Sequence, residues 1–161
     1  RSSAASDVYK RQNINNIQIN EAKEVIPMID IQYTIETEQY GNKTGNRLFI
    51  PANIFRKGFT TPDLKQRVQD IHINYGYLDT DSICLQIPEG YTIESRPKTC
   101  QVTSSFGSFS SSLMIKDKEI CIIHRLLMHR GIYPKEIYKD FLEFRKQIAA
   151  QYSSKIILKK E

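Results

Sequence analysis

Apolar and polar residues alternate along much of this chain, which is the pattern of β-strands with one buried and one solvated face. The alternation is clearest over residues 29–36, where isoleucine and tyrosine are separated by polar residues. It recurs over 71–74, over 83–87 and again over 91–93. We expect the apolar members of each strand to face a core.

Turn residues divide this pattern into strands. Residues 41–45 contain two glycines and predict a hairpin between the strand over 29–36 and a second strand that ends at Pro51. The cluster Asp79-Thr80-Asp81 predicts a further turn, close to Leu78.

Three more strands are expected between residues 99 and 130. Gly107 separates the first two, and Asp117-Lys118 forms a tight turn before the third. Residues 120–128 are apolar on both faces, which is typical of a central strand.

The stretch Cys84–Ser95, CLQIPEGYTIES, interrupts the alternation at Pro88-Glu89-Gly90. A binding loop and a bend between two strands would both contain such residues. We favour the bend, because glycine adopts the positive φ that a sharp change of direction requires.

The period changes from two to 3.6 near the end of the chain. Pro134 is suited to the first turn of a helix, where its missing N–H costs little. Apolar residues then recur at helical spacing, at Ile137, Phe141, Phe144, Ile148 and Tyr152. We expect a helix over about 134–152 and a short strand in KIILKK after it.

Together these elements predict an all-β fold, an antiparallel β-sandwich of about eight strands with one C-terminal amphipathic helix and a short terminal strand. The expected sandwich domain spans residues 13–161 and is single, a size suited to one core. Residues 1–12, RSSAASDVYKRQ, resemble translated sequencing-adapter sequence. We interpret them as an artefact, so that the natural start of the gene lies upstream.

The composition is that of a folded protein, with 40% hydrophobic and 25% charged residues. The net charge of +5 comes partly from the first twelve residues, and both signs are interspersed elsewhere. This surface gives no case for nucleic-acid binding. No apolar run approaches the roughly 18–20 residues of a membrane helix, so no membrane insertion by this segment is expected.

The three cysteines, Cys84, Cys100 and Cys121, are an odd number, which excludes a fully paired set within the chain. We interpret them as free, buried cysteines that act as small hydrophobic residues. His72 and Cys84 lie opposite each other if a hairpin turns near Leu78, but without a feature that would lower the thiol pKa. No catalytic residue is therefore assigned.

Metal and cofactor sites are likewise not assigned. His72, His124 and His129 show no ligand spacing. Asp79 and Asp81, with Asp70 before them, lack the further ligands of a calcium loop, and turn capping explains them better.

Sugar binding by exposed aromatic residues is an alternative, since β-sandwich modules stack sugars on such side chains. The chain has nine Tyr and seven Phe but no Trp. Tyr40, Tyr75 and Tyr77 lie at predicted strand ends and are weak candidates for a binding surface.

Three stretches read together carry a family resemblance: YGNKTGNRLFIPANIF (40–55), DSICLQIPEGYTIES (81–95) and the tail from Ser104 to Lys160. In that order and spacing they resemble the C-terminal domain of unknown function of Bacteroidota transglutaminase-like proteins. The resemblance runs from about residue 24 to the end.

The resemblance implies a papain-like Cys-His-Asp core upstream of this segment, and none of the three cysteines here matches its motif. It implies a non-catalytic accessory domain that packs on that core, in an exported protein of the periplasm or cell surface. The alternative is a free-standing glycan- or protein-binding sandwich.

Overall fold

The chain divides into two compact units, residues 1–42 and residues 43–161. The computed structural model describes residues 12–37, 40–53, 61–64 and 67–161. The sandwich and its helix belong to the second unit, so the range 13–161 expected for one domain spans both. Residues 1–11 of the expected adapter sequence lie outside the described residues.

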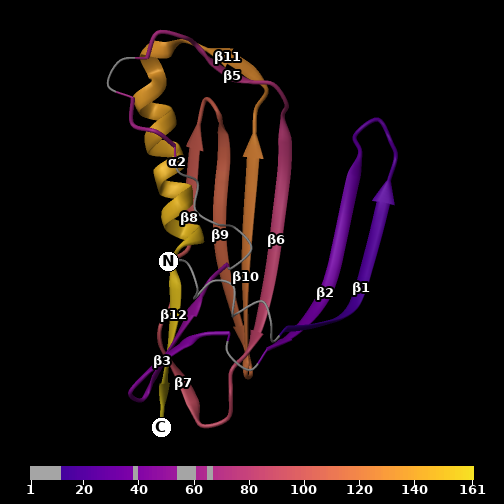
Figure 1. The fold of residues 1–161 in the computed structure, drawn as a ribbon, viewed down its shortest axis with the longest axis vertical. Coiled ribbons are helices and arrows are strands. Elements are labelled where there is room, and N and C mark those ends of the chain that lie inside the picture. Colours follow the sequence, from indigo (N-terminus) through magenta and orange to yellow (C-terminus); the bar gives the residue numbers. More distant parts are fainter. Residues whose placement is uncertain (1–11, 38–39, 54–60, 65–66) are drawn as a thin grey trace. The chain divides into compact units, whose positions relative to one another are not determined.

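The first unit contains an antiparallel ribbon of two strands, β1 (Gln12–Ala22) and β2 (Met28–Thr37) (Figure 1). The predicted hairpin between β2 and the strand that ends at Pro51 is wrong, because β2 pairs with β1. The turn at residues 41–45 instead joins two short neighbouring strands, β3 (Asn42–Thr44) and β4 (Arg47–Pro51). Gly45 has φ +59°, so a turn is present where the sequence predicted one, but it connects β3 to β4.

The second unit is built on a four-stranded antiparallel sheet, called here the long sheet. Its strands, in spatial order, are β6 (Tyr77–Gln86), β10 (Glu119–Met128), β9 (Gly107–Lys116) and β8 (Cys100–Ser104). β10 is central, as its apolar composition predicts, and Asp117-Lys118 forms the turn between β9 and β10. Residues of even number in β10 are buried and define the inner face of this sheet.

A second sheet, called the short sheet, holds the terminal strand. It contains β3, β4, β12 (Lys155–Lys160) and β7 (Tyr91–Ser95) in that order. Pro88-Glu89-Gly90 links β6 of the long sheet to β7 of the short sheet. Gly90 has φ +74°, and the Tyr91 N–H donates to the Pro88 carbonyl at 3.2 Å. The predicted bend is therefore confirmed, and it carries the chain from one sheet to the other.

β6 runs through the predicted turn at Asp79-Thr80-Asp81, so that prediction is wrong. Each residue of β6 pairs with one residue of β10, and this ladder overrides the local turn preference of aspartate. The preceding strand, β5 (Ile71–Ile73), pairs instead with β11 (Gly131–Tyr133). His72 thus faces Ile132 and not Cys84.

The C-terminal helix begins with a 3-10 turn, η2 (Lys135–Ile137), and continues as α2 (Tyr138–Tyr152). It ends where the Ser153 hydroxyl donates to the Ala149 carbonyl at 2.8 Å, before β12. These bounds confirm the helix expected over 134–152. Among the described residues, no helix is long and apolar enough to span a bilayer.

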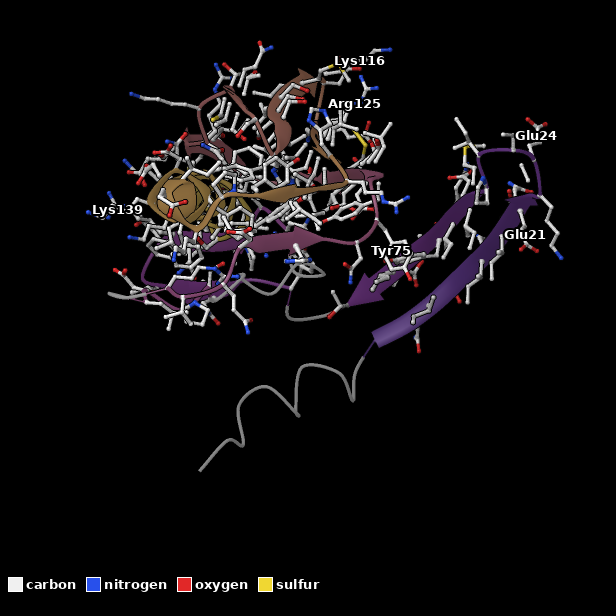
Figure 2. The ribbon with its side chains drawn as sticks, turned by 90° about the horizontal axis from the view of Figure 1, so that it is seen from above. Glu21, Glu24, Tyr75, Lys116, Arg125 and Lys139 are labelled. Carbon is white, nitrogen blue, oxygen red and sulfur yellow. A yellow bond between two sulfur atoms is a disulfide. The ribbon has the colours of Figure 1, made fainter. Side chains whose placement is uncertain are left out.

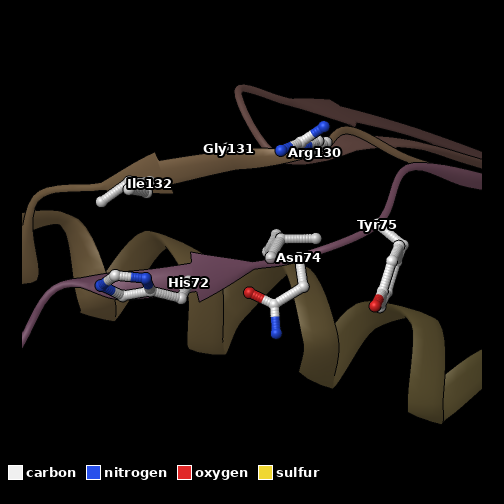
Figure 3. A pocket seen from close by; sticks show the side chains of 7 residues that line it. His72, Asn74, Tyr75, Arg130, Gly131 and Ile132 are labelled. Carbon is white, nitrogen blue, oxygen red and sulfur yellow. The ribbon is translucent and has the colours of Figure 1, made fainter.

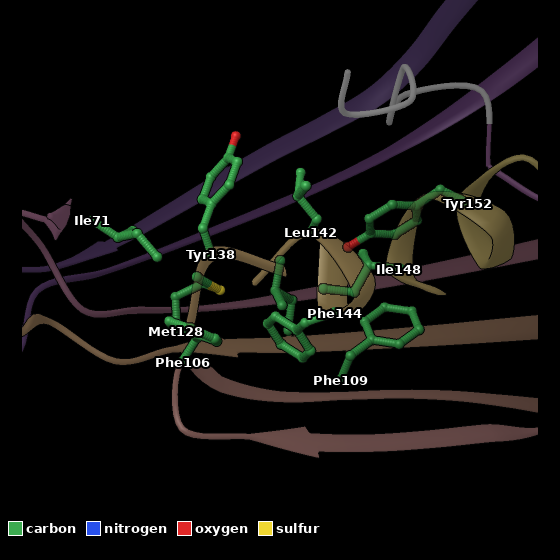
Figure 4. Packing of buried hydrophobic residues seen from close by; sticks show 10 residues of the cluster. Ile71, Phe106, Phe109, Met128, Tyr138, Leu142, Phe144, Ile148 and Tyr152 are labelled. Carbon is green, nitrogen blue, oxygen red and sulfur yellow. The ribbon is translucent and has the colours of Figure 1, made fainter. Parts of the chain in front are cut away.

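The helix packs its apolar stripe on the inner face of the long sheet (Figure 4). Phe144, Ile148 and Tyr152 of α2 are buried, together with Phe109 of β9 and Leu126 of β10. A second set of buried residues comes from both sheets: Ile120 and Ile122 of β10, Ile50 of β4, and Ile156 and Leu158 of β12. In Figure 1, β12 continues the line of α2, so helix and short sheet together form the layer that faces the long sheet.

Gly107, at the start of β9, is required by close backbone packing. Its φ is +150°, and a Cβ atom placed there would lie 1.9 Å from the Leu127 carbonyl oxygen. No side chain fits at this distance, so the predicted break between β8 and β9 has a steric cause.

We predict that Phe109→Ala lowers the free energy of unfolding by about 3–5 kcal/mol, because it removes a ring that is 1% exposed and leaves a cavity. Met114→Ala on the same strand is the control. Met114 is 58% exposed on the outer face, and its loss should cost less than about 0.5 kcal/mol. Urea denaturation measures both, and equal effects would contradict the assignment of the two faces.

Candidate functional site

The β1–β2 ribbon has one apolar and one polar face. The register pairs Ile14 with Ile35, Ile19 with Ile31 and Glu21 with Ile29. Ile17, by alternation with Gln18, and Tyr33 lie on this same face. All of these apolar residues except the half-buried Ile35 are exposed, Ile19 to 65% and Ile31 to 54%. We call this set the apolar ribbon face.

The opposite face of the ribbon is almost wholly polar. It carries the pairs Asn13–Glu36, Asn15–Thr34, Gln18–Gln32 and Asn20–Asp30. A bulge at Asn16, with φ +54°, shifts the register but preserves this segregation. Figure 2 shows side chains on both faces of the ribbon and Glu21 and Glu24 near its tip.

The alternation predicted for β2 is confirmed, but its apolar side was expected to be buried. Ile29, Ile31 and Tyr33 are exposed, so that expectation is wrong. Period-two alternation specifies which residues share a face, but it does not supply the layer that covers the face.

The three candidate tyrosines have different surroundings. The Tyr75 side chain is 81% exposed. Tyr77 forms a side-chain hydrogen bond with Arg145 of α2, whose pKa is lowered by burial and partly restored by Tyr77. The Tyr40 hydroxyl is buried, and burial followed by the nearby Tyr33 raises the pKa of Tyr40 to about 12. Tyr40 belongs to the first unit and the other two tyrosines to the second.

A surface depression of 390 Å³ lies beside the β5–β11 pair and includes Tyr75 (Figure 3). It is lined by His72, Ile73, Asn74, Tyr75, Arg130, Gly131 and Ile132. The labelled side chains in Figure 3 point in different directions and do not converge on one point. A specific ligand site needs convergent polar groups, so the depression is a weak candidate.

A buried polar row crosses the inner face of the long sheet. Asp81 of β6, His124 of β10 and Ser111 of β9 are in register with one another. Asn53, which follows β4, donates from Nδ2 to Asp81 Oδ2 at 3.3 Å, and the same nitrogen lies 3.4 Å from His124 Nδ1. These four residues come from four separate segments, so no spacing in the sequence predicted their contact.

The chemistry of this row is limited by its burial. Serine, histidine and aspartate are the residue types of a hydrolytic triad. His124 is 1% exposed and Ser111 5% exposed, and the His124 ring is stacked on Phe109 and packed edge-on against Tyr152. A substrate has no access to a nucleophile in this position. The hydrogen bonds of Asn53 to Asp81 and His124 instead link the segment after β4 to the long sheet.

Burial lowers the pKa of His124, and the Asp81 carboxylate partly opposes this shift. The neutral ring is the form that accepts an N–H from Asn53 at Nδ1. The folded protein thus favours a neutral His124 imidazole in the core of the second unit.

Cys84 and Cys121 form a disulfide between directly opposed residues of β6 and β10. The interpretation of these two cysteines as free, buried residues is therefore wrong, and Cys100 is the one that is free. The pair is separated by 37 residues in sequence, and only the register of β6 against β10 brings it together. The two residues lie on the outer face of the long sheet, opposite to His124.

Of the other residues considered as metal ligands, Asp81 and His124 are cross-strand neighbours, and the rest lie in different parts of the fold. Asp79 and Asp81 lie within β6, and Asp70 accepts a hydrogen bond from the Lys135 N–H at 3.1 Å. His129 Nδ1 lies 3.2 Å from the Ser105 carbonyl oxygen. Within the described part of the chain, the residues that cluster as three potential ligands are Cys84, Glu119 and Cys121, without a histidine.

Residues 46–158 match a family model described as a domain of unknown function with a solved structure, DUF3858. The chain belongs to the DUF3858 family. The matched range covers the long sheet, the helix and most of the short sheet, whereas β3 and the β1–β2 ribbon precede it. No curated protein and no solved structure matches the chain.

The titration of His124 gives a prediction for stability against pH. Above its unfolded-state pKa of about 6.5 the ring is neutral in both states. As the pH falls below this value, the unfolded chain binds a proton that the folded DUF3858 domain resists, so the free energy of unfolding decreases. Between pH 7.5 and 5 we expect a smaller decrease in His124→Gln than in the wild type, measured by urea denaturation at each pH.

The matched control is His72→Gln, which changes an exposed histidine of β5; an equal change of slope in this variant would show that the effect is not specific to the buried ring. Identical slopes of unfolding free energy against pH for the wild type and His124→Gln would contradict the prediction. They would show that the pKa of His124 is the same in the folded and unfolded states.

Proposed function

We propose that this DUF3858 chain is a non-catalytic accessory domain that packs on another domain of its own polypeptide. The proposed partner is the papain-like core expected upstream. This choice rests on the resemblance of three sequence stretches to Bacteroidota transglutaminase-like proteins. The observation that carries the proposal is the apolar ribbon face.

A two-stranded ribbon is marginally stable in water unless one face is covered by other structure. Here six large apolar residues on one face are exposed, while the opposite face is polar. Segregation of this kind is typical of a strand pair that forms one layer of an interface. The ribbon precedes the family domain in the chain, which is where a contact to an upstream domain is expected.

The buried polar row supports the non-catalytic part of the proposal. Its serine and histidine are enclosed between helix and sheet. Of the two tyrosine candidates in the second unit, Tyr77 is hydrogen-bonded to Arg145. Tyr75 alone is strongly exposed, which is ordinary for a single surface aromatic residue. A glycan-binding module is therefore the second hypothesis and an outcome of the test below.

The disulfide supports an exported location, in the periplasm or at the cell surface. Disulfides form and persist in oxidising compartments and are rare in the cytosol of mesophiles. The bond between Cys84 and Cys121 is consistent with the export that the resemblance implies.

The test is binding between this chain and the core domain encoded upstream in the same reading frame, each purified separately and measured by calorimetry. We expect the wild-type chain to bind and Ile19→Asp/Ile31→Asp to lose at least about 100-fold in affinity, because charges would enter an apolar contact. The double variant places two carboxylates at one cross-strand pair.

Gln18→Asp/Gln32→Asp is the matched control, since it places the same two charges on the neighbouring pair of the polar face. It should bind within about threefold of the wild type, a free-energy change below about 0.7 kcal/mol. The proposal would be contradicted if no core domain is encoded upstream, or if the core domain and this chain do not bind each other. Glycan binding would then be screened.

A further inference from the structure

We propose that reduction of the Cys84–Cys121 disulfide converts the outer face of the long sheet into a zinc-binding site with Glu119 as the third ligand. This inference is independent of the interdomain contact proposed above. It depends on two neighbouring cross-strand pairs of β6 and β10, Cys84–Cys121 and Gln86–Glu119.

The four side chains project from the same face of the sheet. Cys84 and Gln86 are two residues apart on β6, and Glu119 and Cys121 are two residues apart on β10. Side chains at such spacing share a face, and cross-strand partners are neighbours on it. Cys84 is exposed, whereas Glu119 and Cys121 are half-buried, so the site is open to solvent on one side.

Glu119 is already oriented toward the sulfur atoms. Its Oε2 lies 3.6 Å from Cys121 Sγ, and its Oε1 accepts a hydrogen bond from Gln86 Nε2 at 2.9 Å. One carboxylate oxygen is thus held by an amide while the other faces the cysteines. Metal-binding carboxylates are commonly fixed by an outer hydrogen bond of this kind, which gives Gln86 a positioning role.

The distances suit a small ion that prefers sulfur. The potential ligand atoms of Cys84, Glu119 and Cys121 all lie within 4.8 Å of one another. Tetrahedral zinc, with Zn–S near 2.3 Å and Zn–O near 2.0–2.2 Å, separates its ligand atoms by roughly 3.5–3.8 Å. The contact from Glu119 to Cys121 already has this spacing, and the two sulfurs separate once their bond is reduced. Two thiolates favour zinc over magnesium or calcium.

Reduction is a thiol–disulfide exchange with a dithiol reductant. One reductant thiolate attacks the exposed Cys84 sulfur, and the S–S bond breaks with Cys121 leaving as a thiolate. The second reductant thiol then displaces Cys84, so the reductant becomes a disulfide and the protein gains two electrons and two protons. Zinc binding afterwards displaces one proton from each cysteine thiol, and the fourth coordination position is open to water.

The sheet retains the site geometry after reduction. β6 and β10 are paired over ten successive residues, from Tyr77–Met128 to Gln86–Glu119. This ladder places the two cysteines opposite each other whether or not the sulfurs are bonded. The disulfide-linked and metal-bound forms therefore differ chiefly in side-chain positions.

The experiment uses the full chain with Cys100→Ser, which removes the third thiol. The protein is reduced, and Zn²⁺ is titrated in competition with a chromophoric chelator. We expect one zinc per reduced chain and none for the oxidised chain. Cobalt substitution should give a thiolate-to-cobalt charge-transfer band, a signature that a structural role of the cysteines would not produce.

Three further variants in this background test the ligand set. Cys84→Ser should abolish tight binding, and Glu119→Gln and Gln86→Ala should each weaken it by at least about tenfold. Glu89→Gln, which changes an exposed carboxylate in the bend after β6, is the matched control and should bind as the parent does.

Two results would overturn the proposal. One is the absence of a site in the reduced parent, seen either as no more zinc binding than in Cys84→Ser or as loss of the β-sheet in circular dichroism. The other is unchanged affinity in Glu119→Gln, which would leave two cysteines without the carboxylate.

Discussion

The fold depends on one contact, the burial of the apolar stripe of α2 against the inner face of the long sheet. Phe144, Ile148 and Tyr152 contribute the helical side, and Phe109 and Leu126 contribute the sheet. This contact fixes where the helix ends, and therefore where β12 begins. β12 follows the helix directly and pairs with both β4 and β7, so the position of the helix also determines the position of the short sheet. Loss of the contact would affect both layers.

The same contact accounts for the buried histidine. His124 lies between Phe109 and Tyr152, at the level where the layer over the long sheet changes from helix to strand. A polar residue is tolerated there because the Asn53 side chain lies within hydrogen-bonding distance of the His124 ring and also donates to Asp81 of β6. The Ala52 N–H donates to the Ser154 carbonyl at 2.9 Å and holds the end of β4 beside the end of the helix.

The two faces of the long sheet consequently have different chemistry. Its inner face is filled by the helix and the short sheet, and its Ser–His–Asp row is enclosed. Its outer face carries the disulfide, Glu119 and exposed residues such as Met114. On this sheet the exposed Cys84 lies on the outer face, whereas Ser111 and His124, two residue types of a catalytic triad, are buried on the inner face. Residue type alone would have suggested the reverse.

The site residues were predictable only in part. The alternation in β2 correctly identified the amphipathic strand, but not its partner β1 or the exposure of Ile29, Ile31 and Tyr33. The cysteine count correctly required an unpaired cysteine, but spacing in sequence contains no signal that Cys84 meets Cys121. Asp79 and Asp81 have the local preference of a turn, and the ladder with β10 places them in a strand.

By itself, the sequence determined the class of the fold, the three successive strands β8, β9 and β10, the helix with its buried stripe, the bend at Gly90 and the terminal strand. These features follow from periodicity, turn chemistry and the steric demands of glycine and proline, which act between near neighbours. Only the tertiary structure decided which strands pair, which cysteines bond, and which amphipathic surface is left uncovered. Those outcomes depend on register and packing between distant segments, where the free energy of the whole core outweighs any local preference.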